Sequence, residues 1–160
     1  MGYSTEFTGS IEITPRLKKE DKEFLDKFFE IRHMKRDMSK LKGIKKEDIS
    51  KFGKDGCFYL VDDKYDDPTI VDYNDCADMP SLWCDLEVDD NEEGSFIQWN
   101  GSEKSYGIND EVNGWFPWLI KNFFEPKGYT LNGEMDWRGE EWDDTGRINI
   151  VNNKVSLKRL

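Results

Sequence analysis

Residues 129–157 read YTLNGEMDWRGEEWDDTGRINIVNNKVSL, and this stretch decides the fold class. Three runs in it, 129–137, 146–151 and 154–157, have the composition and alternation of β-strands. The pair Asn152-Asn153 suits a two-residue hairpin turn, because asparagine tolerates the positive φ that such turns require. Three consecutive strands with no helix between them predict an antiparallel meander.

The segments before this meander add two helices and further strands. Residues 3–14 alternate apolar and polar side chains as a strand does, and Pro15 ends the run. An apolar stripe at spacings of three and four predicts a helix over 18–36. A second helix is expected over 115–124, with Asn113 as its N-cap. A shorter helix is expected near 46–52.

Further strands are expected at 57–61, 81–88 and 95–99, and the last two should form a hairpin across a turn at Asp89–Gly94. The chain therefore predicts an α+β fold: an antiparallel sheet of about five to seven strands with two main helices packed on one face. The residues expected to be buried together are Phe7, Ile11, Phe24, Phe28, Leu82, Trp99, Leu119, Phe123 and Leu131.

The size and composition favour one domain, residues 1–160, with an aromatic core. Aromatic residues make up 14% of the chain, which offsets a low hydrophobic content of 36%. The first residues lack the pattern of a signal peptide, and no apolar run approaches the ~20 residues of a membrane span. Three cysteines without paired spacing favour a reducing compartment. We therefore expect a soluble, cytoplasmic protein.

Charge is distributed very unevenly along the chain. The net charge is −11, yet residues 1–54 carry 14 Lys and Arg against 10 Asp and Glu, and residues 145–160 carry 4 basic and no acidic residues. Residues 55–144 carry 24 acidic against 5 basic residues. Such a region repels nucleic acid and anionic membranes and attracts basic protein surfaces. The expected partner is therefore a basic protein, with no direct contact to nucleic acid or membrane.

The acidic run from Asp62 to Glu93 holds 13 carboxylates and the single Lys64. On adjacent loops these carboxylates could imitate a phosphate backbone and occupy a basic groove on a partner. The alternative is a solvated, solubilising face, and charge runs are often that. The candidate partner-binding residues are Asp62, Asp63, Asp66, Asp67, Asp89, Asp90, Glu92, Glu93 and Trp142.

Trp142 lies in the polar stretch Glu140–Asp144, where an exposed tryptophan rimmed by acids would suit an interface anchor. The other tryptophans of predicted strands and helices are expected in the core. They are Trp83, Trp99, Trp115, Trp118 and Trp137.

Enzymatic and metal chemistry have weaker support. Asp89-x-Asn91-x-Glu93 begins like an EF-hand loop, but position twelve is Asn100 instead of glutamate. Paired acids at 62–67 or 140–144 could hold Mg²⁺ in a nuclease-like site, and exposed turns explain them equally well. His33, the single histidine, is expected at the surface or at a helix end. No zinc spacing and no nucleotide-binding motif is found, so no cofactor is predicted.

Several blocks of sequence are distinctive in combination. They begin with Gly-Tyr-x-Thr-x-Phe-x-Gly at Gly2, continue with Pro-Ser-Leu-Trp-Cys at residues 80–84, and end with the stretch from Gly128 to Glu140. Together they resemble a family of small bacterial and phage proteins to which no activity is attached. The chain departs from that pattern at Lys18, where a better helix cap is usual, and in its acidic 62–78 loop. The resemblance implies a phage or mobile-element origin.

These observations lead to one expected function and two alternatives. The expectation is a non-enzymatic, acidic inhibitor of a basic partner, such as a phage counter-defence protein of the anti-CRISPR or DNA-mimic kind. An immunity protein that neutralises a toxin would follow the same physics. A metal-dependent hydrolase or nuclease that uses clustered carboxylates is the alternative from another class.

Overall fold

The computed structural model describes residues 2–40, 56–58 and 67–160. The main sheet consists of β1 (Thr5–Thr14), β4 (Leu86–Asn91), β5 (Gly94–Trp99), β6 (Thr130–Gly139), β7 (Thr145–Val151) and β8 (Lys154–Arg159). The helices are α1 (Lys19–Glu30), α3 (Trp115–Leu119) and η4 (Ile120–Phe124). Short elements are β2 (Lys35–Arg36), η1 (Met38–Lys40) and β3 (Ile70–Asp72).

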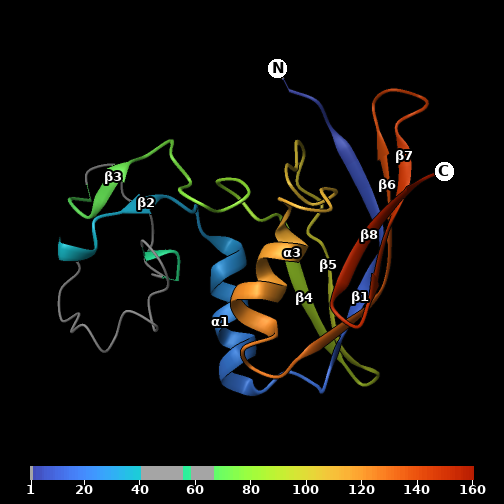
Figure 1. Cartoon of the computed structure of the whole chain (residues 1–160), viewed down its shortest axis with the longest axis horizontal. Helices are drawn as coiled ribbons and strands as arrows, with labels where there is room; N and C mark the ends of the chain where they lie inside the picture. Colours follow the sequence, from blue (N-terminus) through green and yellow to red (C-terminus); the bar gives the residue numbers. More distant parts are fainter. Residues whose placement is uncertain (1, 41–55, 59–66) are drawn as a thin grey trace.

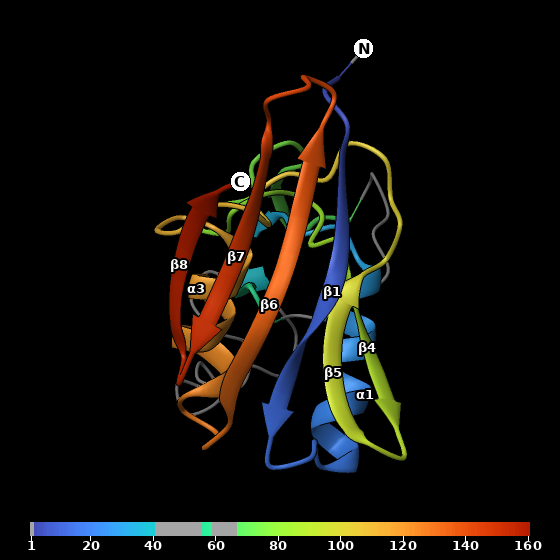
Figure 2. The same cartoon turned by 90° about the vertical axis from the view of Figure 1, so that its right-hand side faces the viewer.

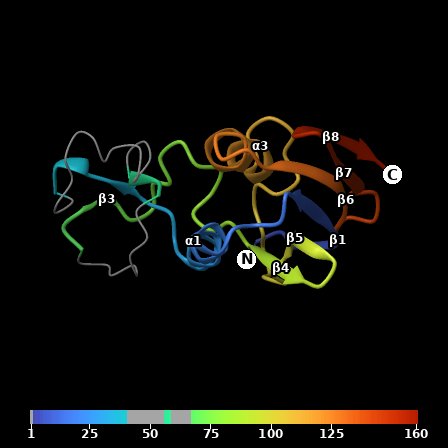
Figure 3. The same ribbon diagram turned by 90° about the horizontal axis from the view of Figure 1, so that it is seen from below.

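The six strands form an antiparallel sheet in the order β4-β5-β1-β6-β7-β8. Helix α1 and the α3–η4 helix lie on the same face of this sheet (Figures 1 and 3). The strands β2 and β3 pair with each other on the far side of α1 from the sheet (Figure 1). This arrangement confirms the predicted α+β class.

The C-terminal meander forms as the sequence predicts. Strand β6 pairs with β7, and β7 pairs with β8, each antiparallel. Asn152 and Asn153 connect the last two strands with φ of 48° and 69°, which is the conformation expected of this turn. Asparagine adopts it more readily than most residues, because its short polar side chain tolerates the left-handed region.

The long strands β1 and β6 approach closely at two glycines. Gly9 has φ +100°, and a Cβ there would lie 2.7 Å from the carbonyl oxygen of Glu134. Gly133 has φ +149°, and a Cβ there would lie 2.8 Å from the carbonyl oxygen of Ser10. Both positions require glycine, since a side chain would collide with the backbone of the neighbouring strand.

An aromatic core fills the space between the helices and the sheet. Phe24 of α1 stacks on Phe123 of η4 with ring centroids 5.1 Å apart, and Phe28 stacks on Trp118 at 5.7 Å. The sheet supplies mainly aliphatic side chains such as the fully buried Ile11. Offset aromatic pairs add to the free energy gained by burial alone. Aromatic side chains therefore form much of the core, as the composition predicts.

Helix α1 ends at Glu30, so the prediction that the helix continues to Arg36 is wrong. Ile31 is already extended, with φ −99° and ψ 158°. The next residues use their backbone N–H groups elsewhere: His33 donates to the carbonyl of Leu82 and Lys35 to that of Asp75, each at 2.7 Å. Tertiary pairing thus overrides the local helical periodicity.

The hairpin of β4 and β5 also differs from the prediction. Strand β4 begins at Leu86, five residues after the predicted start, and it continues to Asn91, which pairs with Gly94. The predicted turn at Asp89–Gly94 is therefore wrong, since Glu92-Glu93 form a two-residue turn. This difference places Asp89 and Asp90 on a strand instead of a loop.

Six of the nine predicted core residues are buried: Phe7, Ile11, Phe28, Leu119, Phe123 and Leu131. Phe24 and Trp99 pack against that core and are partly buried. Leu82 is half-buried and lies outside the core, so this prediction is wrong. Asn113 does not cap the second helix, because the N-cap position belongs to Gly114.

Two predicted elements fall wholly or partly outside the described residues. The short helix near 46–52 lies there, as does most of the strand predicted for 57–61. Cys57 and Phe58, its described part, form a turn. In the described ranges no helix is long and apolar enough to cross a membrane.

Candidate functional site

The edge strand β4 gathers much of the acidity that the structure describes. It carries Glu87, Asp89 and Asp90, and the turn after it adds Glu92 and Glu93. We call these five residues the β4 edge. Because β4 is the last strand on its side of the sheet, this row of carboxylates lies at a border that a partner can approach.

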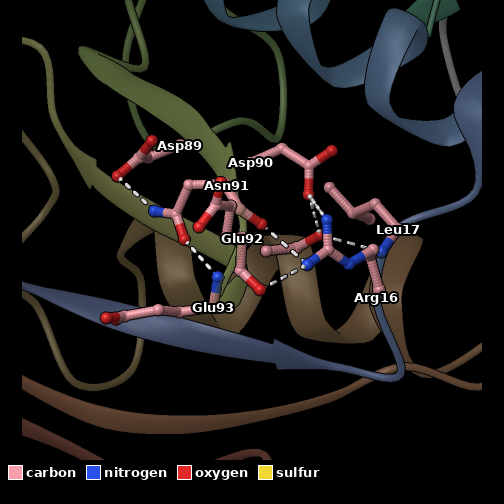
Figure 4. A network of polar contacts seen from close by, with 8 residues as sticks. Arg16, Leu17, Asp89, Asp90, Asn91, Glu92 and Glu93 are labelled. Carbon is pink, nitrogen blue, oxygen red and sulfur yellow. Dashed lines mark hydrogen bonds and ion pairs between the residues drawn. The ribbon is translucent and has the colours of Figure 1, made fainter.

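Arg16 holds the tip of this hairpin in place (Figure 4). Its Nη2 donates to the backbone carbonyls of Asn91 at 2.7 Å and Glu92 at 3.3 Å, and its Nη1 lies 3.4 Å from Asp90 Oδ1. The side chain of Asn91 accepts from the backbone N–H of Glu93 at 2.8 Å. The turn is thereby fixed without using the carboxylates of its glutamates.

The two sides of this tip differ in what remains accessible. The carboxylate of Asp90 accepts from Arg16 and from the hydroxyl of the buried Ser95, at 2.8 Å. The carboxylates of Asp89 and Glu93 extend on the side away from Arg16 (Figure 4). Asp90 therefore stabilises the hairpin through its carboxylate, while the glutamates of the turn, Glu92 and Glu93, are exposed and Asp89 is half-buried.

A groove of about 470 Å³ lies between α1 and β4. We call it the α1–β4 groove. Its floor is apolar, formed by Phe29, Leu86 and Val88. All ten residues that line the groove lie in the described ranges. The charged residues among them are all acidic: Asp26, Glu30, Asp85 and Glu87. The groove therefore combines an apolar floor with a negative rim.

The four carboxylates of the groove have different surroundings. Asp26 forms an ion pair of 2.7 Å with Lys22, one turn earlier in α1, and Glu87 accepts from the amide of Gln98 at 2.9 Å. Burial raises the pKa of Asp85, against the opposing hydrogen bonds of two serines. A cation that entered the groove would offset the free-energy cost of burying this charged carboxylate.

Trp83 forms the aromatic wall of the groove, and 41% of its surface is exposed. The prediction that it belongs to the core is wrong. The hydroxyl of Ser81 donates to the carbonyl of Trp83 at 2.8 Å, and the indole of the buried Trp115 donates to the same hydroxyl at 2.7 Å. The segment is therefore anchored to the core while the Trp83 ring remains partly exposed.

Trp142 lies on the hairpin between β6 and β7 and is 87% exposed, as the sequence predicts. Residues 140–143 form what we call the Trp142 tip. Asp144 fixes its base, because its carboxylate accepts from the indole of Trp137 at 3.0 Å and from the hydroxyl of Tyr3 at 2.8 Å. These two hydrogen bonds lower the pKa of Asp144. An exposed tryptophan thus sits on a firmly held loop.

The β4 edge and the Trp142 tip lie at opposite ends of the sheet (Figure 2). Strand β1 pairs with Gly139 at its residue Thr5 and with Ser95 at its residue Ile13. Eight residues of strand separate these positions, or about 27 Å. The structure does not bring Trp142 and the acidic hairpin into one small site. A single partner could contact both only through a broad surface.

The third predicted group, Asp62, Asp63, Asp66 and Asp67, is described only at its last member. Asp67 Oδ2 lies 3.1 Å from the guanidinium of the buried Arg36, and its other oxygen accepts from the backbone and hydroxyl of Thr69. These hydrogen bonds lower the pKa of Asp67, although its burial acts in the opposite direction. Asp67 thus helps to hold the β2–β3 pair together.

His33 is buried, so the predicted surface position is wrong, but it lies near the end of α1, as the other prediction for it has it. Its Nε2 lies 2.8 Å from the carbonyl of Phe28, and since a carbonyl can only accept, Nε2 carries the proton. Burial lowers the pKa of His33 to about 4, so the ring is neutral at pH 7. Its ring packs on Phe28 with centroids 4.1 Å apart, and this is a structural role.

The described residues contain no group of three or more His, Cys, Asp or Glu side chains placed to hold a metal ion. The EF-hand-like residues Asp89, Asn91 and Glu93 lie on the two-residue hairpin, where the amide of Asn91 bonds to both of the others. In the part of the chain that the structure describes, Cys57, Cys76 and Cys84 form no disulfide. Burial raises the pKa of the Cys84 thiol, so less of it is in the reactive thiolate form at neutral pH.

Comparison with protein-family models, curated proteins and solved structures gives no match. The resemblance to bacterial and phage proteins therefore stays a prediction. Sequence reasoning missed Asp26, Glu30 and Trp83 as parts of one groove, because α1 and β4 are about sixty residues apart along the chain. The outward positions of Asp26 and Glu30, one turn apart on α1, were the available signal.

Proposed function

We propose that this chain is a non-enzymatic, acidic protein that binds and inhibits a basic partner protein. One observation carries the proposal: the carboxylates of the β4 edge continue into those of the α1–β4 groove and form one negative border of the sheet. Like charges placed side by side destabilise the free protein by self-repulsion. A basic partner would relieve that repulsion on binding, and its field would speed the encounter.

The support of this border fits a binding role. Arg16 fixes the hairpin through backbone carbonyls, so the carboxylates of Glu92 and Glu93 remain accessible to another molecule. A surface that is already ordered loses less conformational entropy when it binds. These features favour recognition of a preformed, complementary surface.

The class of partner follows from the charge. A basic groove that normally holds nucleic acid is the surface that a row of carboxylates can occupy. We therefore propose a counter-defence protein of the anti-CRISPR or DNA-mimic kind, acting in the cytoplasm. The resemblance to phage proteins supports the same choice. An immunity protein for a basic toxin would use the same border.

Affinity capture tests the proposal. The chain would be immobilised and exposed to a bacterial lysate at low and at physiological ionic strength, and the retained proteins identified and then re-tested in purified form. We expect a basic protein whose nucleic-acid binding or toxicity falls when the chain is added. Recovery of no basic protein at either ionic strength would contradict the proposal.

A further inference from the structure

We propose that the α1–β4 groove receives an arginine side chain of the basic partner, with the guanidinium against Trp83 and the surrounding carboxylates. The inference rests on the proposed function and adds the residue type that the partner must present. Three observations support it: the shape of the groove, its aromatic wall and the sign of its charges.

The shape and lining suit a long cationic side chain. The groove of about 470 Å³ has an apolar floor that includes the buried Phe29 and Leu86. The methylene stem of an arginine buries well against such a floor, while its charged end reaches the rim. Glu30 and Glu87 are exposed and stand on the two walls, one on α1 and one on β4. A cation between them would meet carboxylates from both sides.

The aromatic wall favours arginine over lysine. Trp83 lines the groove with a partly exposed ring, and tryptophan is the strongest aromatic partner of a cation. A planar guanidinium can stack on the indole and donate two parallel hydrogen bonds to a carboxylate. An ammonium group is compact and strongly hydrated and has neither property. The groove should therefore discriminate between the two basic residues.

The chain's own arginine near Trp83 is held elsewhere. The guanidinium of Arg32 lies 6.0 Å from the ring of Trp83 and only 4.1 Å from that of Tyr73. It also donates to the carbonyl of Tyr73 and the side chain of Asn74. Arg32 does not line the groove. Arg32 therefore does not neutralise Glu30 and Glu87, the two exposed carboxylates on the walls of the groove.

Two defined peptides test the inference without knowledge of the partner. An oligo-arginine peptide and an oligo-lysine peptide of equal length would be titrated into the full chain by calorimetry at physiological ionic strength. We expect the arginine peptide to bind about fivefold more tightly. Trp83→Ala should remove that preference and leave lysine binding unchanged, whereas Trp83→Phe should retain part of it. Tyr106→Ala removes an exposed aromatic ring that does not line the groove, so it is the matched control and should change neither.

The possible outcomes separate the inference from the proposed function. Equal affinity for both peptides, unaffected by Trp83→Ala, would overturn the arginine site and leave the acidic border as a general docking surface. Loss of the preference in Tyr106→Ala but not in Trp83→Ala would also overturn it. Failure of both peptides to bind would contradict the proposed function itself. Unchanged melting temperatures of the variants show that they are folded.

Discussion

The guanidinium of Arg16 donates to the backbone carbonyl of Asn91 at 2.7 Å, across 75 positions of sequence. This bond joins the end of the β1 segment to the tip of the acidic hairpin. Arg16 also forms an ion pair with Asp90. The Arg16 side chain in this pair is half exposed, so the pair adds little to stability. The main effect of Arg16 is therefore to fix where the acids of the hairpin lie.

Arg16→Gln should loosen the hairpin without unfolding the protein. We expect a loss of under about 1 kcal/mol in the free energy of unfolding. Amide hydrogen exchange at Gly94 and Ser95 should become faster, because the turn loses its brace. Arg138→Gln, an exposed arginine on β6, serves as the control. Equal exchange at the hairpin in both variants would show that Arg16 does not hold it.

Stability should fall in mild acid because of His33. Its pKa is about 4 in the folded chain against an ordinary 6.5. Below pH 6.5 the unfolded chain binds a proton that the folded chain refuses until about pH 4, so unfolding becomes easier through this window. The loss should approach about 3 kcal/mol.

Urea unfolding at several pH values measures this effect, with His33→Gln as the comparison. Glutamine can still donate to the carbonyl of Phe28 but cannot titrate. The variant should be less sensitive to pH between 6.5 and 4, although less stable at neutral pH. An identical pH dependence in both proteins would assign the acid sensitivity to other groups.

Leu119→Ala should destabilise the fold strongly. Leu119 is 1% exposed in the layer between the α3–η4 helix and the sheet. We expect a loss of about 2–5 kcal/mol, from lost burial and from the cavity left behind. Val112→Ala, at a position that is 76% exposed, should change stability by less than about 0.5 kcal/mol. Chemical denaturation compares the two, and similar losses would show that Leu119 does not pack between the helix and the sheet.

Trp142→Ala should leave stability unchanged and affect only binding. The side chain is 87% exposed and its removal leaves Asp144 bonded to Tyr3 and Trp137. A standard interface of about 800 Å² per partner is roughly 30 Å across, enough to reach both ends of the sheet. If the partner covers the Trp142 tip, dissociation should become faster and binding should weaken by more than ~1 kcal/mol. Surface plasmon resonance with the captured partner measures this, and an unchanged dissociation rate would remove Trp142 from the interface.

The sequence predicts the strands well where local signals decide them. The alternation in 3–14 and the Asn152-Asn153 turn are local features, and both are confirmed. The helix prediction fails beyond Glu30, because the backbone at His33 and Lys35 pairs with distant segments. No local pattern encodes such a partner.

The same reason limits prediction of the site. The acids of the β4 edge are visible as a charge run, whereas the groove needs Asp26 and Trp83 to meet across two elements. The exposure of Trp142 was predictable because its neighbours are charged, and the exposure of Trp83 was not. Trp83 stands between Leu82 and Cys84, which suggest a buried strand.

The association rate of charge-matched variants measures whether the carboxylates of the β4 edge attract the basic partner. The first variant carries Glu87→Gln, Glu92→Gln and Glu93→Gln on the β4 edge. The second carries Glu6→Gln, Glu111→Gln and Glu125→Gln at exposed positions elsewhere, so both lose the same charge. Association with the captured basic partner would be followed by surface plasmon resonance over a range of ionic strengths. We expect the first variant to associate about tenfold more slowly at low salt and to show a flatter dependence on salt, while the second stays close to the unaltered chain. Equal rates for the two variants at every ionic strength would contradict this expectation.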